Sequence, residues 1–260
     1  MNAQDLARAL AAAREAAAAA ADILRHYWAQ GVTVELKADA TPVTVADREA
    51  ERAIRGILKA ALPEAAIHGE EFGLDGERGG LLWLVDPLDG TKSFVRRTPF
   101  FSTQIALMQS DELLLGVSSA PLYGETMWAS AGTGAWLDGT RVSVAETASM
   151  AEASISTGNI KTLTGDARWD VLGGLILDSN RIRGYGDFCH YHLLARGSLD
   201  LVLESDVNIL DVAALAVIVR EAGGVFTDLE GAPPSLAMRS VLAGTPAIHA
   251  QALRRLYAAR

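Results

Sequence analysis

Two aspartates, Asp86 and Asp89, lie close together in the segment Asp-Pro-Leu-Asp-Gly-Thr, directly after an apolar run at 81–85. The run predicts a buried strand, and Pro87 has no N–H for a strand ladder, so we expect the strand to end here. The two carboxylates can then converge on one point in a loop. Because such carboxylates repel one another unless a cation lies between them, and because Mg²⁺ favours oxygen ligands, the spacing indicates a magnesium site.

Residues near this segment are suited to phosphate chemistry. Gly90 lets the backbone approach a phosphate closely, and the hydroxyl of Thr91 can orient a water molecule. Another carboxylate, Glu70, follows a short apolar run at 65–67 that predicts a second strand end. Asp211 lies in the first turn of a predicted apolar helix, where the helix dipole favours an acidic side chain that is free to face a metal.

The order and spacing of these motifs resemble a known family. Gly-Glu-Glu at 69–71, Asp-Pro-Leu-Asp-Gly-Thr at 86–91 and Asp-Val-Ala at 211–213 are similar to motifs of the inositol monophosphatase superfamily of Mg²⁺-dependent, lithium-sensitive phosphatases. The similarity covers nearly the whole chain, from Lys37 to Gly224. The resemblance implies an α/β (α+β) layered fold, an αβαβα sandwich of two subdomains with the metal site in the cleft between them.

The same resemblance assigns the metal ligands. The first Mg²⁺ would be bound by Glu70, Asp86 and the main-chain carbonyl of Leu88, and the second by Asp86, Asp89 and Asp211. A third, weaker ion near Glu70 is an alternative to the two-metal arrangement. The implied reaction is hydrolysis of a phosphate monoester by an activated water.

Further roles follow from the resemblance. Glu70 and Thr91, with Asp47 behind Thr91, would position the attacking water, and the backbone amides of Gly90 and Thr91 would hold phosphate oxygens. Asp187, Glu204 and Asp211 would contact the part of the substrate that is not phosphate.

Several branches of the family, with different substrates, are compatible with the sequence. Inositol-type members usually have Asn where Ser93 stands and Trp where Leu210 stands, and the segment after Asp89 resembles the histidinol-phosphatase branch. The substrate of that branch carries an amine and an imidazole, which suits a carboxylate at Asp187. Alternatives are an inositol-1-phosphatase, a 3′-phosphatase of adenosine 3′,5′-bisphosphate, a fructose-1,6-bisphosphatase, or a catalytically silent regulatory member. Asp187 as a helix N-cap also stays open.

Net charge, cysteine content and hydropathy limit the classes of partner and location expected for the chain. A net charge of −9 over 260 residues argues against a nucleic-acid surface, whereas bound divalent ions would reverse the local sign and admit a phosphate ester. One cysteine, Cys189, excludes an internal disulfide and is typical of a cytoplasmic protein. No segment approaches the ~20 apolar residues of a membrane span. Family resemblance adds the expectation of a homodimer.

The chain divides into two patterns. An Ala-rich stretch at 4–29 predicts a long helix, and Thr44 predicts the N-cap of a second helix that ends before Pro63. Alternating polarity from 101 to 136 then predicts an antiparallel meander. After residue 153, strands and helices alternate as in an α/β unit. We therefore expect an N-terminal α+β subdomain at residues 1–148 and a C-terminal α/β subdomain at 149–260.

Overall fold

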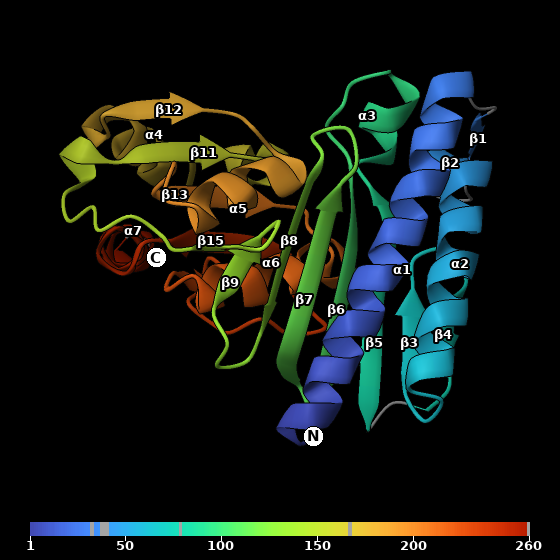
Figure 1. Cartoon of the computed structure of the whole chain (residues 1–260). Helices are drawn as coiled ribbons and strands as arrows, with labels where there is room; N and C mark the ends of the chain where they lie inside the picture. Colours follow the sequence, from blue (N-terminus) through green and yellow to red (C-terminus); the bar gives the residue numbers. More distant parts are fainter. Residues whose placement is uncertain (32–33, 37–41, 78–79, 166–167, 259–260) are drawn as a thin grey trace.

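Helices and sheets alternate in five layers, α, β, α, β and α (Figure 1). This arrangement comes from a computed structural model of the chain, which describes residues 1–31, 34–36, 42–77, 80–165 and 168–258. The predicted layered α/β sandwich is confirmed. Each helix layer buries an apolar face on a neighbouring sheet, and three clusters of buried apolar side chains fill the spaces between the layers.

The first layer consists of two long helices, α1 (Ala3–Gln30) and α2 (Val45–Ala61). Small alanine side chains on the buried face of α1 let it lie close to α2 and to the sheet. Thr44 caps α2 in a capping box, in which the Asp47 carboxylate accepts the Thr44 N–H. Both predicted helices are confirmed, and the box fixes Asp47 at the start of α2.

The first sheet has eight strands in the order β10-β9-β8-β7-β6-β5-β3-β4. All neighbouring pairs are antiparallel except β3 and β5, which run parallel, and the predicted meander is confirmed as β6 to β8. The strands are β3 (Ala66–Gly69), β4 (Gly73–Asp75), β5 (Leu81–Asp89), β6 (Ser102–Gln109), β7 (Glu112–Ala120), β8 (Glu125–Ser130), β9 (Ala135–Leu137) and β10 (Thr140–Val142). Beside α2, β1 (Val34–Leu36) and β2 (Pro42–Thr44) form a two-stranded antiparallel sheet.

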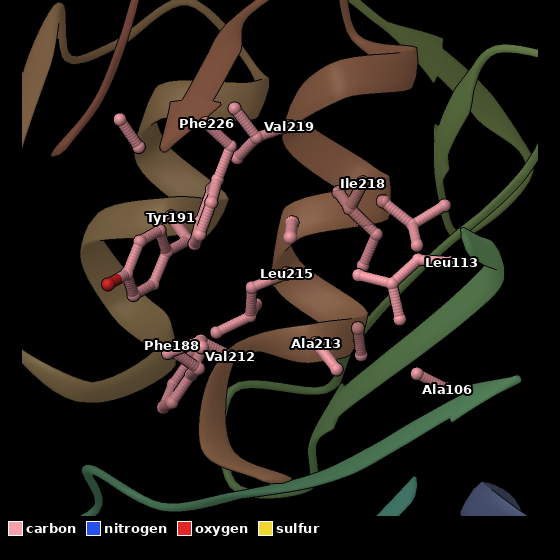
Figure 2. Packing of buried hydrophobic residues seen from close by; sticks show 14 of the residues in the cluster. Ala106, Leu113, Phe188, Tyr191, Val212, Ala213, Leu215, Ile218, Val219 and Phe226 are labelled. Carbon is pink, nitrogen blue, oxygen red and sulfur yellow. The ribbon is translucent and has the colours of Figure 1, made fainter. Parts of the chain in front are cut away.

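The middle layer consists of α5 (Asp187–Ala195) and α6 (Ile209–Glu221). Apolar residues cover almost every face of α6, because the helix is enclosed by both sheets and by α5 (Figure 2). A Cβ at Gly116 would overlap the backbone of Ala214, so the glycine on β7 permits this close packing. None of the described helices is both long and apolar enough to cross a membrane.

The second sheet has five strands in the order β12-β11-β13-β15-β14. Its outer face is covered by α4 (Arg168–Asp178) and α7 (Pro246–Ala258), and its inner face contacts α5 and α6 (Figure 1). The strands are β11 (Ser154–Thr157), β12 (Arg181–Arg183), β13 (Leu201–Ser205), β14 (Val225–Thr227) and β15 (Ser240–Gly244). The remaining helices are α3 (Thr91–Val95) and two short 3₁₀ helices, Met150–Glu152 and Lys161–Gly165.

The expected strand end near Pro87 is confirmed, since β5 ends two residues later, at Asp89, and its register against β6 is irregular between Asp86 and Asp89. The expectation that both aspartates lie in a loop was wrong, because they belong to the strand. The missing N–H of Pro87 is tolerated at this irregularity, and its carbonyl accepts a hydrogen bond from the Thr103 hydroxyl at 2.9 Å. The two carboxylates are therefore presented by a distorted strand end.

The expected division at residues 148 and 149 lies between the two sheets, since β10 ends at Val142 and β11 begins at Ser154. However, α5 and α6 belong to the C-terminal part and share one apolar cluster with the first sheet. Two subdomains with these boundaries stay a prediction.

His249 on α7 makes the stability of the fold pH-dependent. Its ring is buried, with Nε2 at 2.9 Å from the Thr227 hydroxyl, and burial lowers the pKa of His249 from 6.5 to about 4. Between those values the unfolded chain binds a proton at His249 that the native chain does not, so stability rises with pH and is lost as pH falls below 6.5. Between pH 7.5 and pH 4.5, we expect the melting temperature of His249→Gln, measured by circular dichroism, to fall less than that of the wild type.

The control is His26→Gln on the exposed face of α1, which should follow the wild-type pH profile. An unchanged profile in His249→Gln would contradict the assignment.

Candidate active site

Acidic residues from both halves of the chain meet in one cleft of about 330 Å³. The first sheet contributes residues at the ends of β3 and β5, and the C-terminal half contributes residues at the start of α5 and α6. The structure thus brings together almost all of the predicted metal and phosphate residues. The lining residues are Glu70, Asp86, Leu88, Asp89, Gly90, Thr91, Lys92, Ser93, Asp187, Asp206 and Asp211.

Hydrogen bonds from neighbouring groups fix Asp86 and Asp89. The Leu88 N–H donates to Asp86 Oδ1 at 2.9 Å, and the Ser102 hydroxyl donates to Asp89 Oδ2 at 3.1 Å. Ser102 Oγ in turn accepts from Gln104 Nε2 at 2.8 Å. Ser102 and Gln104 were not identified from the sequence, because they lie on β6 and only the pairing of β6 with β5 brings them to the site.

Gly90 is required by the backbone that follows the aspartates. Its φ is +88°, a left-handed conformation, and a Cβ at this position would overlap the Phe100 carbonyl and contact Phe101. The chain turns at Gly90 into α3, which begins at Thr91.

Thr91 and Asp47 are joined as the sequence predicted. Thr91 Oγ1 lies 3.2 Å from Asp47 Oδ1 and 3.0 Å from the Leu88 carbonyl oxygen, so its single proton has two acceptors. Asp47 is completely buried, and burial raises its pKa, although hydrogen bonds from Thr44 oppose this effect. The Asp47 carboxylate therefore accepts from both Thr44 and Thr91, and α2 holds the Thr91 hydroxyl in place.

Parallel pairing of β3 with β5 brings Glu70 to the aspartates. β3 ends at Gly69, and the Glu70 N–H then donates to the Val85 carbonyl at 3.1 Å, directly before Asp86. Glu70 itself is exposed to the cleft. The two strands therefore deliver their carboxylates at the same edge of the sheet.

Asp211 reaches the cleft from the opposite half. It occupies the third position of α6, where Oδ2 accepts the Asn208 N–H at 2.9 Å in a second capping box. The same carboxylate both starts the helix and faces the cleft, as predicted for an acidic residue in the first helical turn.

The acidic residues strongly perturb one another. Burial raises the pKa of Asp86 well above its ordinary value, and the charges of Glu70, Asp89 and Asp211 raise it further. Burial, followed by the charges of Asp187 and Asp211, raises the pKa of Asp89 in the same way. Burial also raises the pKa of Asp211 to about 7. Such shifts are characteristic of carboxylates arranged to receive a cation.

The donor set fits Mg²⁺. Three mutually repelling carboxylates and a backbone carbonyl at Leu88 are hard oxygen donors, and among the described residues no lysine or arginine forms an ion pair with Asp86, Asp89 or Asp211. In that part of the chain, no three His, Cys, Asp or Glu side chains form a ready-made metal cluster. A bound cation would relieve the repulsion among these carboxylates.

A second pocket of about 160 Å³ adjoins the cleft and is also acidic. Asp187 and Glu204 line it, and burial, followed by the nearby charge of Glu204, raises the pKa of Asp187 to about 6. Gly186 is the N-cap of α5, with no side-chain hydrogen bond, so the alternative of Asp187 as a helix N-cap was wrong. Asp187 has φ +45°, a conformation that is costly for a residue other than glycine.

Glu204 is held by three donors. Its Oε2 accepts from the Tyr191 hydroxyl at 2.8 Å and lies 3.2 Å from His190 Nε2, and its Oε1 accepts the Asn159 N–H at 3.2 Å. Although burial opposes ionisation, His190 and the other hydrogen bonds lower the pKa of Glu204 overall. Sequence reasoning did not identify His190, Tyr191 or Asn159, whose roles depend on how α5 packs on β13.

Comparison with known proteins decides the family. Residues 5–259 match the model of the inositol monophosphatase family. This chain belongs to the inositol monophosphatase family. A curated relative, histidinol-phosphatase from Streptomyces coelicolor, is 39% identical over 237 residues, covering 88% of this chain and 87% of the relative. Fructose-1,6-bisphosphatase/inositol-1-monophosphatase from Thermotoga maritima is 33% identical, covering 89% of each chain.

Solved structures agree with this family. The extragenic suppressor protein suhB from Bartonella henselae has a TM-score of 0.86 and 31% identity, covering 94% of this chain and 96% of that one. As a member of the inositol monophosphatase family, this chain is a phosphoric monoester hydrolase. The family is metal-dependent, generally with Mg²⁺, which agrees with the oxygen donors in the cleft.

The contact between Thr91 and Asp47 predicts a kinetic effect. If the Thr91 hydroxyl orients the attacking water, Thr91→Ala should reduce kcat by roughly 10²–10⁴, the range for loss of a positioned proton-transfer group. Asp47→Asn should act through the same hydroxyl, so the double variant should be little worse than the more impaired single variant. Steady-state kinetics of the three variants measure this. A change confined to KM would make Thr91 a phosphate-binding residue instead.

Proposed function

We propose that this chain is a Mg²⁺-dependent histidinol-phosphatase, which hydrolyses L-histidinol phosphate to L-histidinol and phosphate. The observation that carries the proposal is the second acidic pocket, where Asp187 and Glu204 lie beside the metal-binding carboxylates. Histidinol phosphate has an amine and an imidazole, and its cationic end suits such a pocket. The 39% identity to a histidinol-phosphatase supports the same substrate.

In this proposal the ligands of two Mg²⁺ ions come from both halves of the chain. Glu70, Asp86 and the carbonyl of Leu88 would hold the first ion, and Asp86, Asp89 and Asp211 the second, with a third, weaker ion near Glu70 as the alternative. The ions, when bound, supply positive charge to the phosphate and make water a stronger nucleophile. Ser102 would keep the Asp89 carboxylate turned to its ligand position through the 3.1 Å hydrogen bond.

The chain's own residues position the reactants. Glu70 and the Thr91 hydroxyl would position the water by accepting its hydrogen bonds, and Asp47 would hold that hydroxyl by accepting the Thr91 proton in a hydrogen bond. The N–H groups of Gly90 and Thr91 would donate to phosphate oxygens, because the turn at Gly90 leaves the backbone accessible at the cleft. Asp187 and Glu204 would then bind the cationic end of the substrate.

An inositol-1-phosphatase is the principal alternative. An inositol ring offers only hydroxyl groups. These do not require the three carboxylates that line the second pocket in addition to Asp89 and Asp211, which are Asp187, Glu204 and Asp206. Ser93 and Leu210 also differ from the residues usual in inositol-type members. A 3′-nucleotidase, a fructose-1,6-bisphosphatase and a silent regulatory member are further alternatives. Family resemblance supports a lithium-sensitive homodimer, and the single cysteine supports a cytoplasmic location.

Removal of the metal tests the core of the mechanism. We expect chelation to abolish hydrolysis of histidinol phosphate and Mg²⁺ to restore it, and Asp86→Asn to remove turnover because Asp86 is assigned to both ions. Phosphate release and isothermal titration with Mg²⁺ would be measured. The control Asp178→Asn removes an exposed carboxylate on α4 that pairs with Arg255, and it should behave as wild type. Full activity of Asp86→Asn or of the metal-stripped enzyme would contradict the two-metal proposal.

Asp187 tests the substrate. Asp187→Asn should remove a charge-assisted hydrogen bond worth about 1.5–3 kcal/mol and lower kcat/KM for histidinol phosphate by roughly 10–150-fold. Inositol 1-phosphate, whose ring is neutral, should be affected little. Because Gly186 and not Asp187 caps α5, the thermal melt should stay unchanged. Equal losses on both substrates would contradict a role in recognising the cationic end.

A further inference from the structure

Glu51 on α2 is completely buried, yet neither the family motifs nor the mechanism uses it. It lies one helical turn after Asp47, on the side of α2 that faces the turn between β3 and β4. A buried carboxylate must be compensated by donors, and among the described residues the donors to Glu51 belong either to this turn or to Arg55.

The Glu51 carboxylate binds the two residues that follow Glu70. Oε2 accepts the Glu71 N–H at 2.7 Å, and Oε1 accepts the Phe72 N–H at 3.3 Å. Oε1 also accepts from Arg55 Nε at 2.7 Å, in an ion pair one helical turn apart on α2. Both oxygens are therefore engaged, and the carboxylate has a fixed orientation.

Arg55 extends this contact to the start of the next strand. Its second guanidinium nitrogen donates to the Gly73 carbonyl at 2.5 Å, at the first residue of β4. The Glu51–Arg55 pair thus binds three successive residues of the turn through their backbone groups, which are Glu71, Phe72 and Gly73. Such contacts hold the path of the chain whatever the side chains at those positions.

The residue before Glu70 is fitted to the same carboxylate. A Cβ at Gly69 would overlap Oε1 of Glu51, so this position has room only for glycine while Glu51 is in place. Gly69 is paired in register with Val85, whose carbonyl accepts the Glu70 N–H. The backbone of Glu70 is therefore fixed by its hydrogen bond to β5. Its two neighbours in sequence, Gly69 and Glu71, both lie against the Glu51 carboxylate.

We propose that Glu51 is a positioning residue that, together with Arg55, holds the turn at 69–73 so that Glu70 lies beside Asp86. Because α2 also carries Asp47, one helix sets both the Thr91 hydroxyl and Glu70, the two groups assigned to the water. The inference rests on the proposed role of Glu70. It adds that Mg²⁺ affinity and turnover depend on a carboxylate that contacts neither the ion nor the substrate.

The variant Glu51→Gln keeps the shape of the side chain but replaces one acceptor oxygen with an NH₂ group, which cannot accept from a backbone N–H. We expect Mg²⁺ alone, titrated calorimetrically without substrate, to bind about 10- to 100-fold more weakly. We also expect kcat to fall by a similar factor with KM little changed. Amide exchange followed by mass spectrometry should accelerate in the peptide that contains residues 70–73.

The matched control is Glu49→Gln. It makes the same change on the same helix two residues earlier, where the carboxylate interacts with Tyr27 of α1 instead of the turn. It should keep wild-type Mg²⁺ affinity and wild-type exchange at 70–73. Glu51→Gln could instead lower only the melting temperature and leave Mg²⁺ affinity and amide exchange at 70–73 as in the wild type. Glu51 would then stabilise the fold without positioning Glu70, and the proposal would be overturned.

A second test does not depend on Glu51→Gln being stable. Gly69→Ala should weaken Mg²⁺ binding, because its Cβ would displace the Glu51 carboxylate. In a chain that already carries Glu51→Ala, the overlapping group is absent, so Gly69→Ala should weaken Mg²⁺ binding little further. Additive effects in the two backgrounds would overturn the proposal. A wild-type enzyme that bound no Mg²⁺ at all would refute the proposed function itself, so the two failures are distinguishable.

Discussion

Repulsion between carboxylates at the junction of the two halves is the constraint on which the rest of the structure depends. Burial raises the pKa values of Asp86, Asp89 and Asp211, and the charges of neighbouring carboxylates raise them further, so holding these groups together costs free energy of folding. Packed helices and sheets hold the carboxylates together despite this cost. Two sheets pack on α6, whose side chains are mostly buried and apolar (Figure 2). The first turn of this helix carries Asp211. Extensive apolar burial in the middle layer therefore stabilises an arrangement that electrostatics disfavours.

Helix starts and strand ends do most of the positioning. Asp47 and Asp211 each occupy the third position of a helix and accept the N–H of the capping residue, so a carboxylate that starts a helix also serves the cleft. Asp89 closes the irregular end of β5, and Glu70 follows the end of β3. Because the carboxylates of Asp47, Asp89 and Asp211 are held by backbone donors or by a neighbouring hydroxyl, their direction is largely set before any ligand binds, which limits the entropy lost on binding.

In the proposed function, the two halves of the cleft have different chemical tasks. The part next to β5 and α3 combines hard oxygen donors, the backbone of Gly90 and the Thr91 hydroxyl, and would bind the phosphate of any ester. The part formed by α5, β13 and the start of α6 differs in character, since Glu204 stays ionised through His190, Tyr191 and Asn159. Shared phosphate chemistry with a variable second region explains how relatives of one fold can carry names with different substrates.

The sequence by itself determined the layered fold, the long helices and the carboxylates at Asp86, Asp89 and Asp211, because periodicity, caps and motif order are local properties. It placed Asp86 and Asp89 in a loop, whereas both belong to β5, because an irregular register against β6 accommodates the missing N–H of Pro87. Ser102, Gln104, His190 and Glu51 could not be identified, because each acts through a residue distant in sequence. Tertiary structure alone decided these contacts, since hydrogen bonds between elements depend on how layers pack and leave no short-range pattern.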